Sequence, residues 1–320
     1  MTTQTAPLKK LDSEALTLDS VSLWQITRRR LFRRKSSVLG MVILVILVFI
    51  ALTAQWIAPF DPTVSMLDTD NYPQEFAKKR LDPCIHLLGC PKERPQHLMG
   101  LDGNIRDEFS RLLFGARLSL MIGLATVSFA IVIGTVLGAL GGYFGGWIDN
   151  VIMRTMDVLL AFPSLLLAIA IVTVLGPGLI NALIAIGIVS IPAYARVVRA
   201  SVLSVREMDY VSATRALGGS TYEILFKRIL PNALTPLIVQ GTLGIATAIL
   251  DAAALSFLGL GAQPPTPEWG SMLGAERNQV FTAPHLVFYP GFMIMITVLA
   301  FNLLGDGLRD ALDPRLAHAS

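Results

Sequence analysis

Residues 38–58 read VLGMVILVILVFIALTAQWIA, a run without a charged side chain. A helix needs about 20 consecutive apolar residues to cross the hydrocarbon core of a bilayer, and this run meets that requirement. The apolar stretch of a cleavable signal peptide is shorter, about 7–15 residues, and lies closer to the N-terminus. We therefore interpret the run as a retained first membrane span.

The composition of the whole chain is that of an integral membrane protein. Of 320 residues, 53% are hydrophobic and only 15% are charged, whereas soluble domains carry about 25% charged residues. The net charge of +3 is small, and no module of interleaved basic and aromatic residues indicates nucleic-acid binding. Six apolar runs predict an all-α membrane protein with six transmembrane helices, near 38–58, 118–140, 152–175, 179–199, 235–258 and 287–305.

The positions of Lys and Arg predict the orientation of the chain, because these residues gather in cytoplasmic loops. Here they gather in the N-terminal segment and in the loop after the fourth run, which lie on the same side of a six-span protein. They are Lys9, Lys10, Arg28, Arg29, Arg30, Arg33, Arg34, Lys35, Arg206, Arg215, Lys227 and Arg228. Both termini are therefore expected in the cytoplasm.

This topology divides the chain into five parts: a basic cytoplasmic tail (1–36), the first transmembrane helix (37–59), an external loop domain (60–117), a core of helices two to six that includes the cytoplasmic loop 203–232 (118–308), and a cytoplasmic C-terminal tail (309–320). In the first tail, the basic segment around Trp24 is expected to be a helix lying along the inner membrane surface. The external domain holds eight Lys/Arg and nine Asp/Glu. Loops of about 60 residues translocate largely regardless of charge, so this content is compatible with an outside location.

The external domain contains both cysteines of the chain, Cys84 and Cys90, close to His86 and His97. Zinc can bind these residue types, but their spacing matches no familiar zinc pattern, and no metal site is assigned. Outside the cytoplasm oxidation is favoured, so a Cys84–Cys90 disulfide is the preferred interpretation. Free thiols and a metal site remain the alternatives.

Small residues and prolines mark positions where the expected spans pack or bend. Glycines recur close to GxxxG spacing at Gly134, Gly138, Gly142 and Gly145. Such a face lets another helix approach closely. Pro163 and Pro192 interrupt the third and fourth runs, and each removes a backbone hydrogen bond. We expect a static kink or a mobile joint at each proline.

Ionisable side chains inside the spans are candidates for function. Asp251, in TAILDAAALSFLGLG (247–261), lies within the fifth run, where a carboxylate costs roughly 2.5–3.5 kcal/mol on insertion scales. Asp251 and Ser256 are therefore candidates for a translocation path, while a carboxylate hydrogen-bonded to a neighbouring helix is the alternative. Arg154 and Asp157, three positions apart, are expected to form a local pair at the interface.

A short polar hairpin separates the fourth and fifth runs, SATRALGGSTYEILFKRILPN (212–232). Val205–Leu217 is predicted as a helix that ends at Gly218 and Gly219, where a left-handed backbone costs little. Ser220 and Glu223 fit a capping box that starts a second helix, which Pro231 should end.

The second predicted helix is amphipathic. Its apolar residues recur at helical spacing and form one stripe: Tyr222, Leu225, Phe226 and Ile229. Physical chemistry alone leaves two interpretations open. The helix lies on lipid headgroups, or its stripe enters a groove on a cytoplasmic partner.

The hairpin resembles the loop motif of ATP-binding-cassette importer permeases, commonly written E-A-A, three residues, G, nine residues, I-x-L-P. In YVSATRALGGSTYEILFKRILPN (210–232), the matching residues are Ala213, Gly218, Leu230 and Pro231. Ser212, Thr214 and Arg228 depart from the motif. Ser212 stands where a glutamate is usual, so any charge contact of that glutamate is absent or supplied elsewhere.

Other stretches resemble the C-type permease subunit of dipeptide, oligopeptide and nickel importers, in the order of that family. They are RRKSSVLGMVILVILVFIALTAQWIAPFDP (33–62), MGLDGNIRDEFSRLLFGARLSL (99–120), RTMDVLLAFPSLLLAI (154–169), AYARVVRASVLSVREMDYV (193–211) and DAAALSFLGLGAQPPTPEWGSML (251–273). Leu101 and Ile105 depart from the family pattern. The resemblance extends over residues 22–315.

The resemblance implies a type I importer permease fold in a bacterial or archaeal cytoplasmic membrane. It implies a heterodimer with a B-type permease, two cytoplasmic ATPase subunits that bind ATP and Mg²⁺, and an external substrate-binding protein. The chain itself would hold no cofactor and perform no bond chemistry. Residues 220–230 would form the helix that couples to the ATPase. The residues implied in coupling are Ala213, Gly218, Gly219, Ser220, Tyr222, Glu223, Leu225, Phe226, Ile229, Leu230 and Pro231.

Peptides are the substrate class that the resemblance favours, with nickel or a metal chelate as the alternative. Two other classes of protein compete with an importer. An intramembrane aspartyl hydrolase could use Asp157, Asp251 or Asp306 as paired carboxylates, but the predicted topology places no two of them together. A solitary channel would leave the hairpin without a purpose.

Overall fold

The structure, a computed structural model, describes residues 23–69 and 72–312, and this part of the chain is almost entirely helical. The first 22 residues of the expected basic tail and most of the expected C-terminal tail lie outside the described residues. The α-helices are α1 Leu23–Arg33, α2 Lys35–Ile57, α3 Glu108–Phe144, α4 Gly146–Leu160, α5 Ser164–Leu175, α6 Leu179–Arg206, α7 Asp209–Ala216, α8 Leu230–Ala233, α9 Thr235–Phe257, α10 Trp269–Glu276 and α11 His285–Leu312.

Short helical turns complete the structure. They are the 3₁₀ turns η2 Met66–Asp68, η3 Gln74–Phe76, η4 His86–Leu88 and η6 Arg277–Gln279, and the π-helix η5 Glu223–Ile229. Apart from two isolated β-bridges in the segment between α2 and α3, the described residues form no strand. The all-α class is confirmed.

Among the described residues, five helices are long and apolar enough to cross a bilayer, namely α2, α3, α6, α9 and α11. The expected third span, 152–175, is formed by α4 and α5, which meet at 92°. The kink or joint expected at Pro163 is thereby confirmed. The break contains Pro163, which caps the start of α5, and proline removes the backbone donor that would continue α4. Counting this bent pair as one span gives six spans. The other predicted joint, Pro192, lies inside α6, which continues past it.

The second span begins earlier than its hydropathy predicts. Helix α3 starts at Glu108, ten residues before the apolar run, and its first residues belong to the segment expected to be a loop. Asp107 makes this start possible, because its carboxylate accepts a hydrogen bond from the backbone N–H of Ser110 at 2.8 Å. Polar residues thus extend an apolar helix beyond its membrane-spanning part.

The predicted glycine face is the contact between α3 and α6. At Gly138 a Cβ atom would come within 2.4 Å of the backbone oxygen of Ala195, and at Gly134 within 2.7 Å of Tyr194. Any larger residue at these positions would force the two helices apart. Gly145, by contrast, is not part of this contact. It has a φ of +65° and ends α3.

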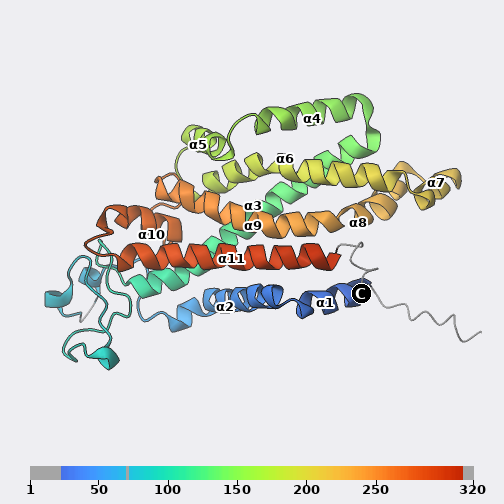
Figure 1. The fold of residues 1–320 in the computed structure, drawn as a ribbon. Helices are drawn as coiled ribbons and strands as arrows, with labels where there is room; N and C mark the ends of the chain where they lie inside the picture. Colours follow the sequence, from blue (N-terminus) through green and yellow to red (C-terminus); the bar gives the residue numbers. More distant parts are fainter. Residues whose placement is uncertain (1–22, 70–71, 313–320) are drawn as a thin grey trace, which may run out of the picture.

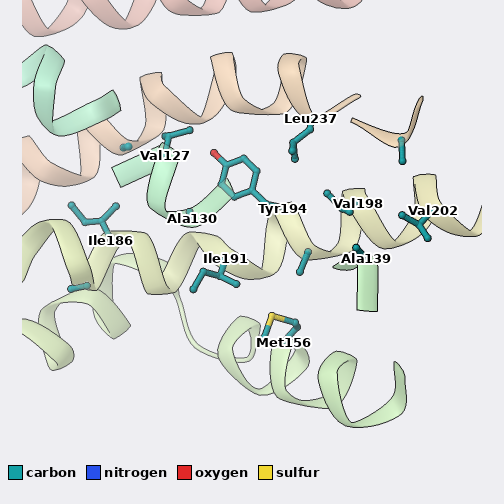
Figure 2. Packing of buried hydrophobic residues seen from close by; sticks show 14 of the residues in the cluster. Val127, Ala130, Ala139, Met156, Ile186, Ile191, Tyr194, Val198, Val202 and Leu237 are labelled. Atoms are coloured by element: carbon teal, nitrogen blue, oxygen red, sulfur yellow. The ribbon is translucent and has the colours of Figure 1, made fainter. Parts of the chain in front are cut away.

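The largest apolar core lies along α6. Figure 2 shows Val127 and Ala130 of α3 near Tyr194, and Met156 of α4 pointing toward α6 from the other side. A second core joins α2, α3, α9, α10 and α11 around Trp269, whose indole N–H donates to the backbone oxygen of Leu112 at 3.0 Å. Figure 1 shows α3 crossing behind α6, α9 and α11.

The two ends of the bundle differ in structure. In Figure 1, the 58–107 segment, α5 and α10 lie at one end, and α1, α7 and α8 lie at the other. The 58–107 segment folds around a small core of its own, built on Met66, Tyr72, Leu101 and Ile105. The buried side chain of His97 stabilises this segment, because its ring nitrogens contact the Tyr72 hydroxyl and the Asp107 carboxylate, each at 2.8 Å.

The cysteines of this segment are bonded to each other. Cys84 and Cys90 form a disulfide with their Cα atoms 5.5 Å apart. Backbone hydrogen bonds in both directions join Cys84 to His97, at 2.8 and 3.1 Å. The disulfide therefore closes a small loop, and backbone hydrogen bonds hold the first residue of this loop, Cys84, in place independently of the disulfide.

Candidate functional site

The candidate site is the hairpin between α6 and α9. Its first half was expected as one helix, Val205–Leu217, and this is wrong. Helix α6 ends at Arg206, Glu207 and Met208 leave the helix, and α7 begins at Asp209. The guanidinium of Arg206 stabilises the bend, because its Nη1 donates to the backbone oxygens of Gly142 and Tyr143 at 3.0 and 3.1 Å, at the end of α3.

The glycine turn lies where the sequence predicts it. Gly218 has a φ of +83°, and a Cβ atom there would meet no other atom within 4 Å. Glycine is needed at this position for backbone conformation rather than for space. The neighbouring Gly219 differs, since a Cβ atom there would lie 2.8 Å from the backbone oxygen of Thr214. The pair thus turns the chain and packs it against α7.

The second half of the hairpin is a π-helix, η5, followed directly by α8. Ser220 caps it as predicted, with its hydroxyl accepting from the backbone N–H of Glu223 at 3.2 Å. The prediction that Pro231 ends the helix is wrong. Pro231 occupies the first turn of α8, which continues to Ala233, and the first turn tolerates proline because its N–H groups have no partner within the helix.

The predicted apolar stripe is divided between two sides of η5. Leu225 and Ile229 are buried against the core of the chain, whereas Tyr222 and Phe226 are 66% and 50% exposed. A π-helix bonds residue i to i+5, and its wider turn rotates the two aromatic residues away from the aliphatic ones. The expectation that all four residues face a partner is therefore wrong.

An exposed apolar surface remains at the tip of the hairpin. We call Leu217, Tyr222 and Phe226 the knob. Leu217 is 89% exposed, and the rings of Tyr222 and Phe226 are in contact with centroids 4.9 Å apart. The basic residues Lys227 and Arg228 are also exposed.

Buried residues of the hairpin join it to the membrane-spanning helices. Val211, Ile224 and Ile229 are fully or almost fully buried in the same apolar core as Val198 and Val202 of α6. The hairpin and the end of α6 therefore share one packed core.

A polar contact that sequence reasoning missed closes the base of the hairpin. The side-chain amide of Asn232 donates to the backbone oxygen of Arg228 at 2.8 Å and to the hydroxyl of Tyr210 at 3.1 Å. Asn232 follows Pro231 directly in the sequence, but nothing there shows that Tyr210, 22 positions earlier, is its partner.

The two residues predicted for a translocation path lie in different surroundings. Ser256 is buried, and its hydroxyl accepts from the backbone N–H of Ala262 at 3.2 Å. Ser256 therefore holds the turn after α9, and its place on a translocation path stays a prediction. Asp251 is partly exposed on α9, and no hydrogen bond or ion pair to it is formed within residues 23–69 and 72–312.

Two ion pairs on α4 replace the predicted local one. Asp157 binds Arg196 of α6 at 2.6 Å, not Arg154, and Asp149 binds Arg199 at 2.5 Å. The partners of both aspartates lie on another helix because the sides of α4 that carry them face α6. The predicted Arg154–Asp157 pair is wrong.

Comparison with known proteins identifies the family of the chain. Residues 113–318 match the family described as binding-protein-dependent transport system inner membrane component. The chain belongs to this family. Residues 22–83 also match the N-terminal TM domain of oligopeptide transport permease C. The predicted relationship to importer permeases is confirmed, and the chain is a multi-pass membrane protein of this family.

Curated relatives match almost the whole chain. The dipeptide transport system permease protein DppC of Alkalihalophilus pseudofirmus is 47% identical, over 93% of this chain and 91% of the relative. The di/tripeptide transport system permease protein DppC of Pseudomonas aeruginosa is 49% identical, over 89% and 90%. The glutathione transport system permease protein GsiD of Pectobacterium atrosepticum is 44% identical, over 92% and 91%.

Solved structures support the fold. A chain of the MetNI methionine ABC transporter, in an inward-facing conformation, superposes with a TM-score of 0.52 at 20% identity, covering 63% of this chain and 96% of that chain. A second crystal form gives 0.51 at 21% identity, covering 64% and 97%. The type I importer permease fold predicted from the sequence is confirmed at the level of the fold.

Proposed function

We propose that the chain is the C-type permease subunit of an ATP-driven importer of di- and oligopeptides. The observation that carries the proposal is the match, over about nine tenths of both chains, to transport permeases named for dipeptides, di/tripeptides and glutathione. These three substrates are small peptides. A B-type permease would complete the pathway, and an external binding protein would deliver the peptide.

The hairpin end of the bundle is proposed to face the cytoplasm. Basic residues gather at this end, in the hairpin and in α1, as the positive-inside rule requires of cytoplasmic segments. The opposite end carries the 58–107 segment with its disulfide, which suits an oxidising compartment. Both termini would then be cytoplasmic.

The knob is proposed to insert into a cleft of a partner ATPase. Its two aromatic rings offer apolar area at a protruding tip, which is the usual form of an anchor in a protein interface. The buried residues behind it share one core with α6, so a displacement of the knob would move α6 as a rigid lever. ATP hydrolysis, performed by the partner, would switch the accessibility of the pathway in this way.

The competing functions gain no support from the geometry. For an aspartyl hydrolase, Asp157 would have to approach another carboxylate, but it is bound to Arg196 at 2.6 Å. For a nickel importer with a cysteine ligand, a free thiol would be needed, but Cys84 and Cys90 are bonded to each other. Neither function is proposed.

Removal of the knob tests the coupling role. The double variant Tyr222→Ala and Phe226→Ala should abolish co-purification of the ATPase and peptide uptake, while the permease pair still assembles. Phe281→Ala is a matched control for co-purification, because Phe281 is an exposed aromatic residue in the short connection between η6 and α11. This connection follows α10, which lies at the end of the bundle opposite the hairpin. If the double variant retains the ATPase and transports peptide at the wild-type rate, the knob is not the coupling element.

A further inference from the structure

One side of α6 and α9 is left uncovered by the rest of the chain. Helix α3 packs on α6 through Tyr194 and Ala195, and on α9 through Ile245 and Ile249. In the part of α6 that follows Pro192, the exposed positions lie on the side away from these contacts: Ala193, Arg196, Ala200 and Ser204. We call the uncovered side of the two helices the open face.

Polar side chains of α9 follow the open face. Gln240, Thr247 and Asp251 are spaced seven and four residues apart, which places them on one side of an α-helix. Thr247 is exposed and the other two are partly exposed. The hydroxyl of Thr247 donates within α9, to the backbone oxygens of Leu243 and Gly244 at 3.2 and 3.1 Å. The side chains of Gln240 and Asp251 indicate contact with water or a polar partner, because lipid would penalise them.

A cavity of about 440 Å³ continues this line toward the hairpin end. Gln240 lines it together with Val197 of α6, Val239 and Leu243 of α9, and Arg309 of α11. The volume is within the range of small-molecule sites, about 300–1,000 Å³. The open face therefore leads from Asp251 into a space that can hold a dipeptide.

Asp251 is a charged group of this face without a partner among the described residues. Arg196, the cation on the adjacent helix, is already bound to Asp157 at 2.6 Å. Within residues 23–69 and 72–312, no donor forms a hydrogen bond or an ion pair with the Asp251 carboxylate. An ionised carboxylate only accepts hydrogen bonds, so what satisfies it must be a donor, and a cation gives the strongest bond.

We infer that Asp251 binds the ammonium group at the N-terminus of a peptide as it crosses the open face. This inference rests on the proposed peptide transport. A free peptide carries this cation at neutral pH, since the pKa of an α-amino group is about 7.7–8.0. One helical turn away, the Thr247 hydroxyl donates to backbone oxygens within α9 and can accept a hydrogen bond from the peptide N–H. Asp251 thus favours peptides with a free amino terminus.

The test uses the complete importer in proteoliposomes, with its binding protein and ATPase, and two labelled probes, dialanine and N-acetyl-dialanine. Any preference of the binding protein is the same for wild type and variant, so it cancels when each probe is compared between them. Asp251→Asn should lower dialanine uptake at least tenfold and N-acetyl-dialanine uptake less than twofold. Asp251→Glu, which keeps the charge, should restore dialanine uptake to within threefold of wild type.

Asp306→Asn is the matched control, because Asp306 is an exposed carboxylate on another spanning helix, α11. Uptake of both probes by this variant should stay within twofold of wild type. Equal losses for both probes, no loss for either, or failure of the Asp251→Asn complex to assemble would overturn the inference. The last outcome would assign Asp251 to pairing with the second permease. A wild-type complex that imports neither probe would instead contradict the proposed function.

Discussion

Asp157 of α4 and Arg196 of α6 form an ion pair at 2.6 Å although 39 positions separate them. Asp149 of α4 and Arg199 of α6 form a second ion pair between the same two helices, at 2.5 Å. The first pair is about half exposed on both sides, whereas the Asp149 side chain is only 14% exposed. The two pairs fasten the same two helices in different surroundings, and their contributions to stability should differ.

Replacement of the two aspartates by asparagine should separate these contributions. Exposed ion pairs contribute about 0–1 kcal/mol, whereas hydrogen bonds to charged groups in less exposed sites contribute about 1.5–3 kcal/mol. Asp149→Asn should therefore lower the Tm of the purified complex by several degrees more than Asp157→Asn does. Thermal unfolding in detergent measures the difference, and equal shifts would contradict it.

The effect of a substitution at Gly218 on peptide uptake should depend on the backbone conformation that the new residue tolerates rather than on its size. The position has a φ of +83° and free space around it, and asparagine tolerates this conformation far better than a β-branched residue. Gly218→Asn should keep most of the peptide uptake, and Gly218→Val should lose most of it. If the two variants transport equally well, the left-handed turn is not required.

Replacement by alanine should have different effects at the adjacent residues Leu225 and Phe226, one on stability and the other on binding to the ATPase. Leu225 is 4% exposed, so Leu225→Ala leaves a cavity and should cost about 2–5 kcal/mol of stability. Phe226→Ala removes an exposed ring and should leave the Tm of the permease pair nearly unchanged while weakening its binding to the ATPase. The Tm and the yield of co-purified ATPase, measured on both variants, distinguish the two residues. A large Tm loss in Phe226→Ala would show that its ring belongs to the core.

The sequence is sufficient for those features of the fold that depend on local properties. A span such as 38–58 follows from the length of an apolar run, and the close packing of α3 on another helix follows from the spacing of Gly134 and Gly138. The conformation of Gly218 follows from the need of a tight turn for a residue without a side chain. Each of these features is decided within a few residues of chain.

Features that depend on distant residues are not predictable in this way. Asp157 has a basic residue three positions away, yet its partner Arg196 is on another helix. The π-helix η5 has no sequence signal, and within it Leu225 is buried while Phe226 is exposed. For Ser256, helical spacing gives no sign of the Ala262 N–H that its hydroxyl binds.

The Cys84–Cys90 disulfide should be present in the protein taken from the membrane and should stabilise only its own loop. Bridging residues six positions apart contributes about 2 kcal/mol in the chain-entropy model, and Cys84 is held independently by its backbone hydrogen bonds to His97. Without a reductant, N-ethylmaleimide should therefore label neither cysteine, as mass spectrometry would show. The double variant Cys84→Ser and Cys90→Ser should keep the fold of the 58–107 segment and become more sensitive to proteolysis only near Leu87 and Leu88, which are exposed at the tip of the loop. Labelling of the native protein without reductant would place this segment in a reducing compartment and would contradict the proposed orientation.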